Sequence, residues 1–223
     1  MPDWLSDATA WVLPVVLAVT LHEAAHGWMA ERFGDDTARL LGRVSFNPLK
    51  HVDRFGTIIL PGLLLLLHSP FVFGYAKPVP VNFRRLQPLR LGMFMVALAG
   101  PGTNVLLALV SGILLHVDKL VTPEQVPWLF LNLYRALMIN CVLAVFNLIP
   151  VLPLDGGRVV DSLLTGAPKR LFSKLERYGV ALVMLALLIP AMLGFSQVQE
   201  ALSVPIFWLV EQVMWLTGNG VQG

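Results

Sequence analysis

Long apolar stretches restrict the folds open to this sequence more than any other feature. Four of them, at 8–30, 91–117, 127–150 and 178–195, reach or approach the roughly 20 residues that a helix needs to cross a bilayer. Of the 223 residues, 56% are hydrophobic and 13% are charged, which lies outside the usual range of soluble domains. The first stretch is not preceded by the basic residues of a cleavable signal peptide, so we expect it to be retained. We predict an all-α polytopic protein of the cell membrane, embedded in the lipid bilayer.

Two shorter apolar segments, 56–73 and 203–217, bring the expected number of hydrophobic helices to about five or six. Segment 56–73 contains Pro61, Gly62 and Pro70 and has basic loops on both sides. We therefore expect it to re-enter the membrane with irregular backbone rather than to cross it. Segment 203–217 is compatible with a span or with a helix in the membrane interface.

Two segments are expected to be extended. Those around 43–48 and 76–82 combine proline with β-branched residues, and we predict that they form a small membrane-associated β element. No internal repeat, linker or shift of composition divides the chain. A single domain, 1–223, is therefore predicted, with a motif-bearing core at about 8–165 and C-terminal helices at about 175–217.

The distribution of Lys and Arg predicts how the chain is oriented. Segments 31–54, 75–90 and 156–177 contain five, four and five of these residues, whereas none precedes residue 31 or follows residue 178. The positive-inside rule places these three segments in the cytoplasm, and the N-terminus and 117–127 outside. The net charge of +2 is spread over several loops, so we expect no nucleic-acid partner.

Ionisable side chains interrupt the first apolar stretch in the sequence "HEAAH". On a helix, His22 and His26 share one face and can bind the same metal ion, while Glu23 lies at the rim. Such an ion polarises a carbonyl and lowers the pKa of its bound water, whose proton the glutamate takes and later passes to the leaving amine. The motif also arises by chance. However, unpartnered ionisable residues in a membrane helix cost about 2.5 to 3.5 kcal/mol each, which favours the metal site.

A catalytic zinc ion usually takes three protein ligands, so a third must come from elsewhere in the chain. The best candidate is Asp155 in "NLIPVLPLDGGRVV", where prolines and glycines break the helix that ends near Asn147. This bend and "HEAAH" lie at the same predicted membrane depth. The alternative is that Asp155 caps the following helix. Two imidazoles and a carboxylate suit one Zn²⁺ ion per chain but also iron, cobalt or manganese.

Two further polar residues are candidates for substrate contact. Asn147 offers an amide that could hydrogen-bond a substrate carbonyl or oxyanion, or instead link two helices. His51, in "NPLKHVD", could also contact substrate, although a solvated loop histidine is the simpler interpretation. The single cysteine, Cys141, excludes an intramolecular disulfide and a cysteine-built metal site.

Five motifs together resemble the site-2 protease family of intramembrane zinc metalloproteases, in its short form without a PDZ domain. They are "HEAAH", "NPLKHVDRFGT", "GYAKPVPVN", "ALAGPGTN" and "FNLIPVLPLDGGR", and the resemblance covers residues 15–165. It implies that His22, His26 and Asp155 bind zinc. It also implies that Glu23 is the general acid/base and that Asn147 helps to hold the substrate peptide.

The same resemblance assigns two further features. "ALAGPGTN" would open a core helix, with Gly100, Pro101 and Asn104 in structural roles at its tightly packed start. The predicted strands would receive an extended substrate by edge pairing.

We therefore expect an endopeptidase that hydrolyses peptide bonds of a transmembrane or membrane-inserted protein or peptide near the cytoplasmic side. One alternative is an ion- or proton-coupled transporter that uses the buried His, Glu and Asp cluster. Against it, the sequence has no inverted repeat, and its polar groups gather at one end of the predicted helices. A second alternative is a non-catalytic zinc-containing chaperone, in which Glu23 would have no role as a base.

Overall fold

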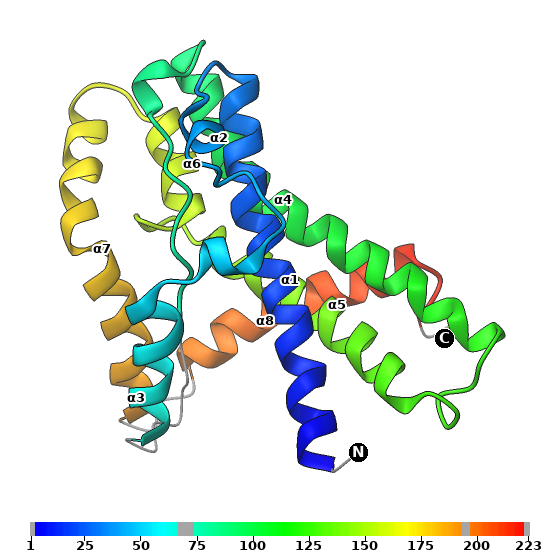
Figure 1. Ribbon diagram of the computed structural model, residues 1–223. Helices are drawn as coiled ribbons and strands as arrows, with labels where there is room; N and C mark the ends of the chain where they lie inside the picture. The colour runs from blue at the N-terminus through cyan, green and yellow to red at the C-terminus, as the bar shows by residue number, and fades with distance from the viewer. Residues whose placement is uncertain (1–2, 67–73, 193–196, 221–223) are drawn as a thin grey trace.

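The computed structural model describes residues 3–66, 74–192 and 197–220, and these fold into helices joined by irregular segments (Figure 1). The α-helices are α1 (Asp3–Arg32), α2 (Thr37–Leu40), α3 (Leu60–Leu66), α4 (Leu89–Leu114), α5 (Pro127–Asn147), α6 (Asp155–Leu163), α7 (Gly166–Met192) and α8 (Gln197–Leu216). Between them lie the 3-10 helices η1 (Pro48–His51), η3 (Phe83–Arg85) and η4 (Leu115–Lys119) and the π-helix η2 (Arg54–Ile59).

Among the described residues, three helical segments are long and apolar enough to cross a membrane: Thr9–Arg32, Leu89–Lys119 and Pro127–Asn147. They confirm that three of the four predicted crossing segments are apolar helices of sufficient length, and that the described part of the chain is all-helical. The fourth, 178–195, extends into residues outside the described part of the chain. The predicted re-entrant segment 56–73 begins with η2 and α3, so its Pro61 and Gly62 are helical where we expected irregular backbone. Residues 67–73 lie outside the description, and re-entry stays a prediction.

Helices α1, α4 and α5 pack against one another, and α6 packs against α4. Small buried residues such as Ala18, Ala97 and Ala144 lie in these helices, which lets the backbones approach closely. One apolar cluster joins α1 to the start of α4 through Ala30, Leu86, Met93 and Val96. A second joins α4, α5 and α8 through Ala108, Leu137, Cys141 and Val213. Figure 1 shows α7 standing to one side of this assembly.

The predicted β element is wrong for the described residues, because neither 43–48 nor 76–82 forms a strand. Residues 74–82, which we call the strap, form neither helix nor strand, and Pro78 and Pro80 have no backbone N–H with which to build a ladder. Four of the strap's other amides each donate to one acceptor, two to backbone oxygens and two to carboxylates. They donate from Tyr75 to Gly56 O (3.0 Å), from Lys77 to His51 O (2.9 Å), from Val79 to Glu23 Oε2 (2.7 Å) and from Asn82 to Asp35 Oδ2 (2.6 Å).

We expected the motif "ALAGPGTN" to open a helix, and this is wrong. The motif lies in the middle of α4, which begins at Leu89. Gly100, Pro101 and Asn104 are all buried there. The proline is accommodated inside the helix, as is common in membrane-spanning helices whose neighbours satisfy the freed backbone groups.

Candidate metal centre

Helix α1 carries the two histidines of the candidate site on the face that meets α4. His22 and His26 are one helical turn apart and are only 7% and 9% exposed. Their rings stand at 82° to each other, and their Nε2 atoms are 3.1 Å apart. The local helix therefore brings both imidazoles to one point, as their spacing predicted.

A tight turn brings Asp155 to the same point. It is the first residue of α6, after the chain has left α5 at Asn147 and bent through 148–154. A Cβ at Gly156 would lie 2.1 Å from the backbone oxygen of Leu148, so this packing requires glycine. The capping alternative for Asp155 is wrong, because the cap position is occupied by Leu154 and no side chain caps this helix. The Oδ2 atom of Asp155 lies 3.2 Å from His22 Nε2 and 3.4 Å from His26 Nε2.

The hydrogen bonds of the two imidazoles determine which nitrogen faces the aspartate. His22 Nδ1 lies 2.6 Å from Asn104 Oδ1, and His26 Nδ1 lies 2.7 Å from the backbone oxygen of Val96. Both oxygens are acceptors, so in the neutral imidazole each Nδ1 carries the proton and each Nε2 presents a lone pair. Three acceptor atoms, two Nε2 and Asp155 Oδ2, thus converge in a buried place.

These three atoms fit a metal ion. Asp155 Oδ2 is buried and has no hydrogen-bond donor, which is costly unless a cation balances it. The separations of 3.1, 3.2 and 3.4 Å are close to the roughly 3.3 Å between neighbouring ligands of a tetrahedral zinc ion with bonds of about 2.0 Å. The cluster of His22, His26 and Asp155 could therefore hold a metal ion.

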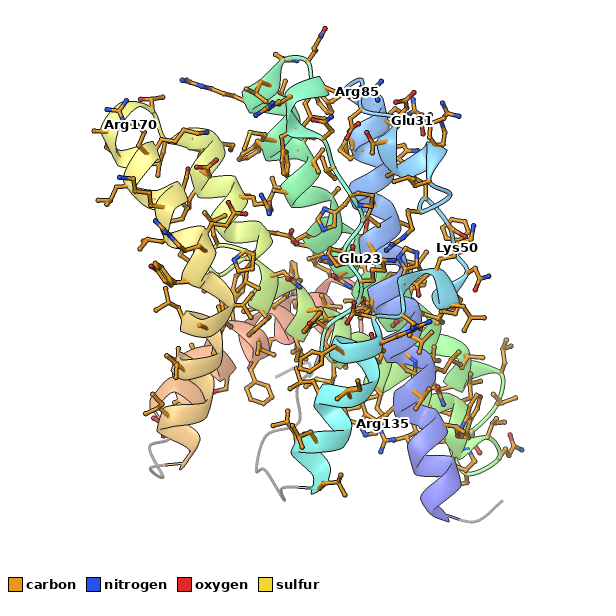
Figure 2. All side chains as sticks on the ribbon, turned by 60° about the vertical axis from the view of Figure 1, so that its left-hand side comes forward. Glu23, Glu31, Lys50, Arg85, Arg135 and Arg170 are labelled. Atoms are coloured by element: carbon orange, nitrogen blue, oxygen red, sulfur yellow. The ribbon has the colours of Figure 1, made fainter. Side chains whose placement is uncertain are left out.

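Glu23 lies beside the cluster but is not one of its three members. Glu23 is labelled in Figure 2, and its Oε2 atom accepts the backbone N–H of Val79 in the strap. The strap reaches this position because Val79 packs against the Cα of Gly27, where an added Cβ would lie 3.1 Å from the valine Cγ1 atom. The carboxylate is thus fixed through one oxygen.

A cavity of about 570 Å³ adjoins these residues. It is lined by the cluster, by Glu23, by strap residues including Pro78 and Val79, and by Val180 and Val183 of α7. Asn147 also lines it, and its Nδ2 donates to Leu143 O of the preceding turn (3.0 Å). All five residues that the sequence assigned to the zinc site and its catalysis thus line this one cavity, from two segments that are distant in the chain.

The interpretation of His51 as a solvated loop histidine is wrong. Its side chain is 3% exposed, and Nε2 lies 2.9 Å from Ser45 O. It is not among the residues that line the cavity, and its backbone oxygen supports the strap at Lys77. Burial of a loop histidine depends on how the strap folds back over η1, which local sequence does not show.

Two residues next to the cluster were assigned only structural roles from the sequence. Asn104 contacts His22 directly, and Gly100 lies under both imidazoles, where a Cβ would be 2.5 Å from His22 Cε1 and from His26 Nε2. The available signal was an asparagine inside an apolar helix, because polar groups at membrane depth are expensive and frequently functional.

Comparison with known proteins gives an independent result. A model of peptidase family M50 matches residues 10–126 and 123–191. Two relatives carry the name "Putative zinc metalloprotease": YwhC of Bacillus subtilis (strain 168) and Rip2 of Mycolicibacterium smegmatis (strain ATCC 700084 / mc(2)155). The first is 35% identical over 80% of this chain and 80% of its own, and the second is 26% identical over 79% of this chain and 66% of its own. No solved structure matches the chain.

Proposed function

We propose that this chain, which belongs to peptidase family M50, the site-2 protease family, cleaves peptide bonds of transmembrane or membrane-inserted proteins. Its class as a zinc metalloprotease follows from the family. The membrane-embedded substrate, the ligands of the zinc ion and the roles of single residues are our proposal.

One observation carries this proposal, namely the approach of Asp155 to His22 and His26. The three side chains come from α1 and from the start of α6, 129 residues apart between His26 and Asp155. They meet beside a cavity and next to helices long enough to cross a membrane. A metal-dependent hydrolase needs this combination of a ligand set, an adjacent carboxylate and space for a substrate.

In this proposal His22, His26 and Asp155 hold one zinc ion per chain, which would supply Lewis acidity toward the scissile carbonyl and a water molecule. Glu23 accepts a proton from that water as its oxygen joins the carbonyl carbon. The carbon–nitrogen bond then breaks, and Glu23 returns the proton to the leaving amine. Val79 N–H holds Oε2 of Glu23, so the carboxylate stays oriented between these two transfers.

Asn147 is proposed to hold the substrate peptide. Its amide nitrogen uses one hydrogen on Leu143 O, which leaves a second hydrogen and the amide oxygen for a peptide group in the cavity. A helical substrate hides its amides in internal hydrogen bonds, so the bond to be cut must first unwind. Segments with helix-weakening residues near the cleavage point are therefore the preferred substrates.

We propose that the site faces the cytoplasm, because basic residues cluster at one end of the folded molecule and the site lies toward that end. Figure 2 shows Arg85, Glu31 and Arg170 at one end of the molecule, with Glu23 below them and Arg135 toward the other end. The positive-inside rule assigns the basic end to the cytoplasm.

The test uses purified protein in proteoliposomes with a set of single-span substrates that carry Gly, Pro or Asn near the cytoplasmic end of the span. We expect cleavage by the wild type and none by Glu23→Gln, while metal analysis finds the same zinc content in both. Glu31→Gln is the matched control, because Glu31 lies on the last turns of the same helix and pairs with Arg39 at 2.7 Å. Normal cleavage by Glu23→Gln, or ion flux without any cleavage by the zinc-loaded wild type, would refute the proposal.

A further inference from the structure

We propose that Asn104 and Asn140 form a relay that fixes the tautomer and the ring orientation of His22 for metal binding. Both are positioning residues, since neither lines the cavity. This inference rests on the metal centre of the proposed function and extends it to two side chains for which the sequence suggested no chemical role.

The relay crosses three helices. Asn104 Oδ1 in α4 lies 2.6 Å from His22 Nδ1 in α1, and Asn104 Nδ2 donates to Asn140 Oδ1 in α5 at 2.8 Å. Asn140 Nδ2 in turn donates to the backbone oxygen of Ala136 at 2.8 Å. Asn104 is fully buried and Asn140 is 3% exposed, so water does not compete for these groups.

The far end of the relay sets its direction. Ala136 O can only accept, so Asn140 must turn its amide nitrogen toward it and its Oδ1 toward Asn104. Asn104 must then donate with Nδ2, and its Oδ1 is left to accept. His22 can satisfy that oxygen only with a proton on Nδ1, which leaves the lone pair of Nε2 for the metal. A rotation of either amide would place two acceptors against each other.

The two histidines are hydrogen-bonded by different groups on one face of α4. Val96, Gly100 and Asn104 follow at intervals of four residues and therefore lie above one another on the helix. The Val96 carbonyl holds His26, the absent side chain of Gly100 leaves space for both rings, and the Asn104 amide holds His22. A backbone carbonyl has a fixed direction, whereas an asparagine amide can rotate. On the His22 side the Asn104 amide is therefore fixed by further acceptors of its Nδ2, namely Asn140 Oδ1 at 2.8 Å and, at the longer distance of 3.5 Å, Ala18 O.

A merely structural role would make these asparagines links between helices that stabilise packing. The chain offers a matched control for that role in Asn132, which is also on α5, is 7% exposed, and donates through Nδ2 to Trp128 O at 2.9 Å. It repeats the contact of Asn140 with the preceding turn but has no contact with the cluster among the described hydrogen bonds.

The experiment measures zinc affinity by chelator competition, the absorption spectrum of the cobalt-substituted protein, and the melting temperature in excess EDTA, all with the full chain. We expect Asn104→Leu to weaken zinc binding by about 10- to 100-fold, the usual loss when a residue that hydrogen-bonds a metal ligand is replaced. The cobalt spectrum should change as well. Asn140→Leu should weaken it in the same direction. Asn140→Asp should stay near wild type, because a protonated carboxyl presents the same donor and acceptor. Asn132→Leu should leave both metal readouts unchanged.

Wild-type zinc affinity in Asn104→Leu would overturn the relay, as would equal losses in Asn140→Leu and Asn132→Leu. If Asn104→Leu does not fold, the comparison of Asn140→Leu with Asn140→Asp decides the question, and equal affinities there overturn the relay. Failure of the proposed function looks different: the wild type itself would then bind no zinc, or Glu23→Gln would still cleave.

Discussion

Substitution of Gly100 by alanine tests the candidate centre most directly, because it adds one carbon where the two imidazoles meet α4. The new Cβ would lie 2.5 Å from His22 Cε1 and from His26 Nε2 and 2.6 Å from His22 Nε2. Ordinary contact distances are about 3.5 Å, so the rings must move by roughly 1 Å. Such a shift exceeds the tolerance of roughly 0.2 Å for metal–ligand distances.

The expected result is a loss of zinc affinity of at least about 100-fold. This is the upper end of the loss caused by replacing one residue that hydrogen-bonds a metal ligand, and here two ligands move. Overpacking should also lower stability by about 1 to 3 kcal/mol. Zinc content after dialysis against a weak chelator and the melting temperature in EDTA measure the two effects separately.

Gly102→Ala is the matched control, because it lies in the same motif and a Cβ there meets nothing within 4 Å. It should bind zinc as the wild type does and should not lower the melting temperature, because alanine favours a helix more than glycine does. Wild-type zinc binding by Gly100→Ala would show that the imidazoles do not lie against this part of α4, and the geometry of the centre would then be wrong.

Three further predictions concern the strap and the metal. Arg43→Ala removes the guanidinium that donates to Lys77 O (2.7 Å) and Pro78 O (3.3 Å), so limited proteolysis should cut the strap faster while zinc content stays constant; unchanged cutting would contradict this role. Asp35→Asn replaces a buried carboxylate that accepts from Asn82 N and Thr37 N with a neutral amide, which accepts more weakly. The free energy of unfolding should fall by about 1 to 3 kcal/mol, and an unchanged melting temperature would contradict this role of Asp35. Zinc at 100 times its dissociation constant should stabilise the wild type by about 2.7 kcal/mol, and the shift in melting temperature should disappear in EDTA. No shift would mean that the cluster binds no zinc.

The parts of the site that depend on short-range geometry were predictable from the sequence. The spacing of His22 and His26 fixes their common face once the segment is helical. Asp155 could be added because the basic loops show which end of each helix is cytoplasmic. Both Asp155 and the two histidines lie at such ends, and therefore at a similar depth in the membrane. Both inferences use distances along the chain and the thickness of a membrane, and neither needs side-chain packing.

The surroundings of the site could not be predicted in the same way. The contact between Asn104 and His22 depends on how α4 is rotated about its axis relative to α1, and an apolar helix gives little sign of that rotation. The strap was misread because its β-branched residues favour extended backbone, whereas its prolines remove the donors that a strand requires. The burial of His51 depends on the fold of the strap and was missed for that reason.

The bond between Val79 N–H and the Glu23 carboxylate has a mechanical consequence. Because the strap forms one wall of the cavity, lifting it to widen the entrance would also withdraw the only backbone donor described at Glu23. A substrate therefore cannot enter past a lifted strap while Val79 N–H holds the Glu23 carboxylate in position. A polypeptide that enters past Val180 and Val183 of α7, which also line the cavity, would leave this bond intact and meet a base that is already oriented.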